Sequence, residues 1–82
     1  MNNNSWGWTS YRRTLWVRPD GMRLYFAHFL RVSAPGVLAQ GQVTETVRIH
    51  FWAKRPVLAL RRMVTSGENP AHFDGKDMAT DG

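Results

Sequence analysis

Arginine and aromatic side chains alternate along two predicted strands of this 82-residue chain. Guanidinium groups bind phosphates and base edges, and flat rings stack on unpaired bases, so this combination is typical of nucleic-acid-binding surfaces. The candidate binding residues on one predicted sheet face are Arg23, Tyr25, Phe29, Arg31, Arg48, His50 and Trp52, which Arg18 joins in one of two turn registers. Ordinary cross-strand pairing explains the same residue types equally well, because exposed sheet faces commonly carry Arg, Thr and aromatic side chains.

Three histidines, His28, His50 and His72, are the side chains best suited to acid–base chemistry near neutral pH. By alternation, His28 falls on the predicted core face and His50 on the opposite face, so the two are not expected to meet. No nucleophile motif, carboxylate pair or metal-ligand spacing accompanies them, and we expect no enzyme activity, metal or cofactor. The one enzymatic alternative is a metal-independent ribonuclease with His50 as base and Arg48 or Arg31 stabilising phosphate charge.

Period-two apolar spacing predicts three strands that must position these side chains, and helical spacing follows them. The strands cover residues 11–18, 22–32 and 43–53, and a helix begins at Pro56 and closes at Gly67. The predicted core face carries Leu24, Phe26, His28, Leu30, Val32, Val47, Ile49 and Phe51. The fold class is therefore α+β, a three-stranded antiparallel sheet in β-β-β-α order with one short C-terminal helix packed on one face and flexible tails.

The turn between the first two strands leaves two registers open. A two-residue loop at Asp20-Gly21 places Arg18 opposite Arg23 and extends the basic face. A three-residue loop, Pro19-Asp20-Gly21, places Val17 opposite Arg23 and Leu15 opposite Tyr25. Turn chemistry favours the longer loop, since Pro fits the second position of a type I turn, whereas the overall charge favours the shorter one.

Charge divides the chain into parts of opposite sign. Residues 1–65 hold ten of the eleven basic residues and only Asp20 and Glu45 as acids, while residues 66–82 hold Lys76 and four acids. We predict a flexible segment over residues 1–9, a small α+β domain over residues 10–65, and an acidic, largely disordered tail over residues 66–82. The tail is a candidate competitor for the basic face.

We therefore expect a small basic protein that binds nucleic acid, DNA rather than RNA, through the exposed sheet face. The alternative is a non-enzymatic interaction module, a homodimer or a small inhibitor of a host factor, that uses the same face, because Tyr, Trp and Arg are also enriched in protein interfaces. No apolar run approaches the length of about 20 residues that a membrane helix needs, so no membrane partner is expected. The absence of cysteine indicates a reducing compartment, the cytoplasm.

Overall fold

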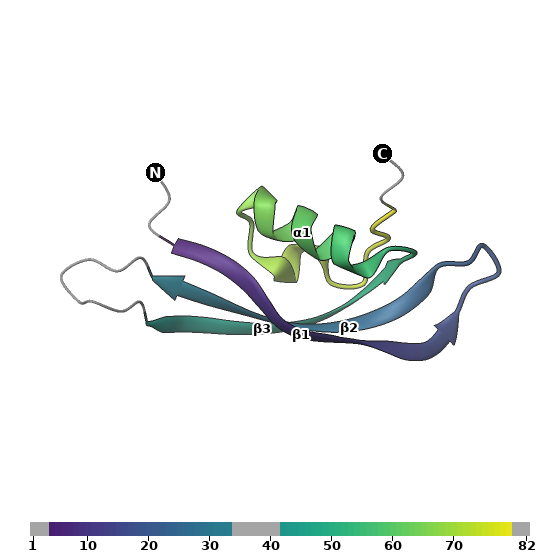
Figure 1. Ribbon diagram of the computed structural model, residues 1–82, viewed down its shortest axis with the longest axis horizontal. Coiled ribbons are helices and arrows are strands. Elements are labelled where there is room, and N and C mark those ends of the chain that lie inside the picture. The colour runs from purple at the N-terminus through teal and green to yellow at the C-terminus, as the bar shows by residue number, and fades with distance from the viewer. Residues whose placement is uncertain (1–3, 34–41, 80–82) are drawn as a thin grey trace.

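A three-stranded antiparallel sheet with a helix across one face makes up the molecule (Figure 1). The computed structural model describes residues 4–33 and 42–79. The elements are strands β1 (Asn4–Val17), β2 (Arg23–Ser33) and β3 (Val43–Ala53), helix α1 (Pro56–Ser66) and a short 3-10 helix, η1 (Pro70–Phe73). The strand order is β1-β2-β3 with both pairs antiparallel, which confirms the predicted α+β fold and its β-β-β-α order.

The β1–β2 turn adopts the longer of the two loops. The Arg18 amide donates to the carbonyl of Met22 at 2.7 Å, and the Gly21 amide donates to the carbonyl of Arg18 at 2.9 Å. Gly21 has a φ of 90°, a conformation that L side chains rarely adopt. Val17 consequently lies opposite Arg23, as the three-residue loop requires.

An irregularity just before this turn changes the rest of the hairpin register. Arg13, and not Leu15, lies opposite Tyr25, because three residues of β1 face a single residue of β2 between these pairs. The Thr14 hydroxyl donates to the carbonyl of Leu24 at 2.9 Å and accepts from the Trp16 amide, which stabilises the bulge. A bulge of this kind bends the strand and redirects its side chains.

The faces of β2 are the reverse of those predicted. Tyr25, Ala27 and Phe29 are buried beneath the helix, while Phe26 and His28 lie half-buried on the opposite face. The faces of β3 are as predicted, with Ile49 and its same-face neighbours inside. Since both faces of β2 are largely apolar, alternation alone could not orient it, and the register against β3 decides which side chains enter the core.

Helix α1 has the start and the end that its sequence predicts. Pro56 occupies the first turn, and Gly67 closes the helix in the left-handed conformation at a φ of 76°. Ala59, Leu60 and Met63 are buried against the sheet. The core cluster consists of Trp6, Tyr25, Ala27, Phe29, Ile49, Phe51, Ala53, Ala59, Leu60 and Met63.

The C-terminal segment, which the sequence predicts to be disordered, packs along β3 over residues 67–79. Pro70 is buried, and Phe73 and Met78 pack against the core cluster. Hydrogen bonds join this segment to the edge of β3 that does not pair with β2, including one from the Trp52 N–H to the Lys76 carbonyl at 2.9 Å. The average composition of this segment is polar and therefore does not reveal that its few apolar side chains contact the core.

The N-terminal segment also differs from the predicted flexible start. Strand β1 begins at Asn4, and Trp6 is only 9% exposed within the core. The tryptophan pair at Trp6 and Trp8 anchors this end, because burying such large rings is strongly favourable. The predicted flexible residues 1–3 and the last three residues of the tail lie outside the described part of the chain.

Phe29→Ala should lower the free energy of unfolding by about 3–5 kcal/mol, because a fully buried ring is replaced by a cavity. Leu15→Ala is the control, since Leu15 is 96% exposed, and it should change stability by no more than about 0.5 kcal/mol. Urea unfolding followed by circular dichroism measures both. Equal effects of the two substitutions would contradict the observed burial of β2.

Candidate nucleic-acid interface

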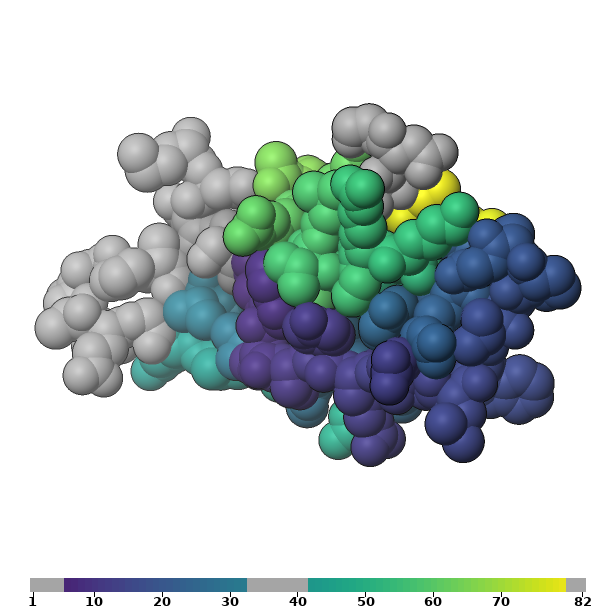
Figure 2. All heavy atoms as spheres, turned by 45° about the vertical axis from the view of Figure 1, so that its right-hand side comes forward, coloured from purple at the N-terminus to yellow at the C-terminus, as the bar shows by residue number. Residues whose placement is uncertain are grey.

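The sheet face that α1 leaves uncovered, here called the outer face, is formed by all three strands. It is the lower side of the sheet in Figure 1. In Figure 2 the side chains of β1, in purple, lie below the green helix at the edge of this face. Neighbouring strands place alternate residues side by side according to their register. The outer-face residues are Ser10, Arg12, Leu24, Phe26, His28, Leu30, Thr46, Arg48, His50 and Trp52.

A one-residue bulge in β1 brings Arg12 to this face. Trp8 lies opposite Phe29, yet Ser10 lies opposite His28, so Thr9 is the additional residue. The Thr9 hydroxyl donates to the carbonyl of His28 at 3.3 Å. The bulge turns the strand over, with the tryptophans inside and the following alternate residues, beginning with Ser10, outside.

Two rows of three side chains cross the centre of the outer face. The first row is Ser10, His28 and Arg48, and the second is Arg12, Phe26 and His50. In the second row the Arg12 guanidinium lies over the Phe26 ring, 5.4 Å from its centroid, and the His50 ring meets that ring edge-on at 4.4 Å. Phe26 is therefore the centre of a cluster of cationic and imidazole groups.

Among the described strand residues, the charged side chains of the outer face are all positive. No strand position on this face carries Asp or Glu in the described ranges, and Arg48 forms no ion pair there. A groove of about 330 Å³ opens between these groups, lined by Ser10, Tyr11, Arg12, Phe26, His28 and Arg48. Two guanidinium groups beside a groove without carboxylates favour an anionic ligand.

The predicted binding residues divide between the two faces. Arg48 and His50 are exposed on the outer face and Trp52 is half-buried there, as the alternation in β3 predicts. Tyr25 is only 8% exposed and Phe29 is fully buried, so the prediction that these two rings are accessible is wrong. They belong to the core because β2 presents the opposite face.

Two of the predicted arginines lie on the helix side of the sheet. Arg31 forms an ion pair with Glu45 at 3.5 Å, and Glu45 in turn accepts from the Asn69 amide. Arg23 shares the face of Tyr25 and is half-buried at the end of the sheet. Neither residue belongs to the outer face.

Arg18 connects the β1–β2 turn to the C-terminal segment. Its guanidinium forms ion pairs with Asp20 and with Asp77, the latter at 2.7 Å, and lies 5.2 Å from the centroid of the Trp52 ring. The hydrogen bond to Asp20, followed by the bond to Asp77, raises the pKa of Arg18 above its ordinary value. With two carboxylates on it, Arg18 acts as a clamp between segments.

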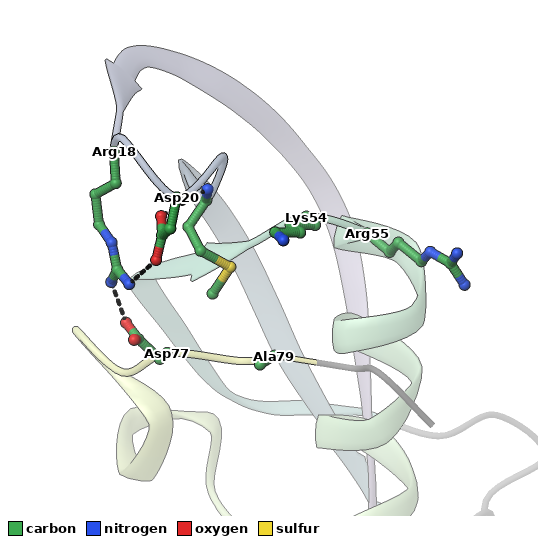
Figure 3. A pocket seen from close by; sticks show the side chains of 7 residues that line it. Arg18, Asp20, Lys54, Arg55, Asp77 and Ala79 are labelled. Carbon is green, nitrogen blue, oxygen red and sulfur yellow. Dashed lines mark hydrogen bonds and ion pairs between the residues drawn. The ribbon is translucent and has the colours of Figure 1, made fainter.

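A second cavity, of about 470 Å³, lies beside this clamp (Figure 3). Its walls include Met22, which follows the turn, and Lys54 and Arg55, which lie between β3 and α1. In Figure 3 the Arg55 side chain points away from the Arg18–Asp20 pair. The carboxylates of Asp20 and Asp77 line this cavity too, so its charge is mixed, in contrast to the outer-face groove.

Sequence reasoning missed Arg12, Phe26 and His28 as outer-face residues. The bulge that redirects Arg12 is centred on Thr9, which is neither Gly nor Pro, and the nearby Gly7 does not by itself mark its position; β2, in turn, has two apolar faces. His28 interrupting one of these faces is the one signal that pointed to the correct orientation, because a buried histidine needs a partner.

Comparisons with models of known families, with curated proteins and with solved structures find no match for the chain. Over residues 4–33 and 42–79, no group of three or more His, Asp and Glu side chains is arranged to hold a metal ion. No helix within those ranges has the length and apolar character needed to cross a bilayer.

Arg18→Gln should raise the pKa of Asp20 toward its ordinary value, because the Arg18 hydrogen bond is the largest cause that holds it low, ahead of the Met22 amide. The stabilisation by this pair is present above the unfolded-state pKa of Asp20 and is lost as pH falls through the lower folded-state value. NMR titration of the Asp20 carboxyl carbon measures the shift. Arg61→Gln on α1 is the control, and an unchanged Asp20 titration in Arg18→Gln would refute the clamp.

Proposed function

We propose that this chain binds nucleic acid through the outer face of its sheet. The observation that carries the proposal is the row of Arg12, Phe26 and His50 beside the unpaired Arg48, on a face without carboxylates among the described residues. Guanidinium groups bind phosphates, and ring faces stack on unpaired bases. A cytoplasmic location belongs to the same proposal and is supported by the absence of cysteine.

The shape of the face favours single strands as the ligand. A three-stranded sheet offers a broad surface on which bases can stack, and Phe26 and Trp52 are the half-buried rings that it presents. The preference for DNA over RNA stays a prediction, and direct comparison of the two tests it.

The double substitution Arg12→Gln/Arg48→Gln should weaken binding and reduce its salt dependence. For a single strand, each lost phosphate contact lowers the slope of log K against log salt by about 0.7, so the pair should lower it by about 1.4. Fluorescence anisotropy with labelled single-stranded DNA and RNA, from about 50 mM salt upward, measures both quantities.

The matched control is Arg61→Gln/Arg55→Gln, which removes the same charge from exposed positions at α1. It should retain most of the affinity and a slope nearer to that of the wild type. No binding by the wild type at low salt, or equal losses in both double variants, would count against the outer face as the site.

A second candidate function is self-association, favoured by an apolar tip at the end of the β1–β2 hairpin, at the right of Figures 1 and 2. Leu15, Trp16 and Val17 form this tip and are 96%, 69% and 52% exposed. Contiguous exposed apolar side chains mark interaction sites more often than isolated ones do. We propose self-association at this hairpin end and not through the sheet face that the sequence suggested for an interaction module, with a second copy of the chain as the partner.

Leu15→Glu should convert a concentration-dependent dimer into a monomer, because a carboxylate at the tip opposes its burial in an interface. Thr65→Glu, an exposed change at the far end of α1, should leave the dimer intact. Analytical ultracentrifugation over a range of concentrations reports the mass. A wild-type chain that is monomeric throughout, or a dimer that survives Leu15→Glu, would remove this candidate.

A further inference from the structure

Two histidines that alternation assigns to opposite faces lie on the same face, the outer face, as diagonal neighbours on β2 and β3. His28 lies directly opposite Arg48, and His50 lies two residues further along β3. Diagonal neighbours on adjacent antiparallel strands are about 7–8 Å apart at the backbone and closer at the side chains. His28, Arg48 and His50 therefore form a triangle with the guanidinium at one corner and an imidazole at each of the others.

Neighbouring residues position the side chains of the triangle without forming hydrogen bonds to the two imidazole rings among the described residues. The His50 ring packs edge-on against Phe26, and the His50 amide donates to the Asp74 carboxylate at 2.9 Å, which fixes the backbone of β3 there. His28 lines the outer-face groove with Ser10 and Arg48. Within the described residues, no side chain forms a hydrogen bond or an ion pair with either imidazole.

We infer that this triangle cleaves RNA without a metal, an inference that rests on the proposed binding of nucleic acid to the same face. Arg48 holds the phosphodiester between the imidazoles. One imidazole, neutral, takes the proton of the ribose 2′-hydroxyl while that oxygen forms a bond to phosphorus. The other, protonated, gives its proton to the 5′-oxygen as the phosphorus–oxygen bond breaks. The products are a 2′,3′-cyclic phosphate and a 5′-hydroxyl, and no water, oxidant or reductant takes part.

Each member of the triangle has a role that the reaction requires. Proton transfer by positioned side chains accelerates such steps by about 10²–10⁴-fold, and histidine is the side chain most often used. Arg48 stabilises the charge that develops on the phosphate oxygens in the transition state. Arg12 lies across Phe26 from His50, in the row next to that of His28 and Arg48. A neighbouring phosphate of the same RNA strand would reach it there.

The test is incubation of the full chain with a single-stranded RNA and with the DNA of the same sequence, both in EDTA. Mass spectrometry should find RNA fragments that end in a 2′,3′-cyclic phosphate and intact DNA. His28→Ala and His50→Ala should each slow cleavage by about 100-fold or more. Each should change the affinity for RNA, measured by anisotropy, by less than about threefold, because Arg12 and Arg48 remain. The rate should depend on pH as a bell-shaped curve in the wild type.

His72→Ala is the matched control, since His72 is exposed on η1 and belongs to neither row. It should cleave as the wild type does, and circular dichroism verifies the fold of every variant. RNA that the wild type binds but does not cleave would overturn this inference and leave the proposed function standing, whereas a wild type that binds neither RNA nor DNA would overturn both. Cleavage that persists in the His28→Ala/His50→Ala double variant would also overturn the inference.

Discussion

The pairing of β2 with β3 fixes the rest of the molecule. Tyr25 lies opposite Phe51 with the two rings stacked at a centroid distance of 5.8 Å, and this contact places their face of the sheet beneath α1. A shift of one residue would move every side chain of β2 to the other face. The core, the outer face and the position of His28 beside Arg48 all follow from this register. The candidate site therefore depends on a contact buried on the opposite side of the sheet.

The elements of the fold could be predicted from the sequence because each has a local cause. Pro56 and Gly67 mark the ends of α1, and Pro19-Asp20-Gly21 has the residues of a three-residue turn. The faces of β3 also followed from alternation, because its two sides differ in polarity. The faces of β2 did not, because Phe26 and Leu30 are as apolar as Tyr25 and Phe29. Only contacts between strands distinguish such faces, and these contacts have no local signal.

The candidate site was predicted in part for the same reason. Arg48, His50 and Trp52 were placed correctly because they belong to β3, whereas their β1 and β2 neighbours depend on two bulges and a register. The segment after α1 was misjudged on composition. Its polar residues dominate any average, but Phe73 and Met78 are spaced to reach the core while backbone bonds join the segment to β3. A few well-placed contacts outweigh average composition when a neighbouring edge offers hydrogen bonds.

Net charge describes this protein poorly, because its arginines have different partners. Arg18 and Arg31 are held by carboxylates and join segments of the fold, while Arg12 and Arg48 extend from a face without them among the described residues. Two acids of the C-terminal segment have partners as well, since Asp77 binds Arg18 and Asp74 accepts from the amide of His50. These two carboxylates have their partners at the edge of the sheet and form no ion pair with Arg12 or Arg48. The net charge of +5 therefore understates the cationic character of the outer face, because Asp20, Asp77 and Glu45 are in ion pairs with Arg18 and Arg31 in other parts of the fold.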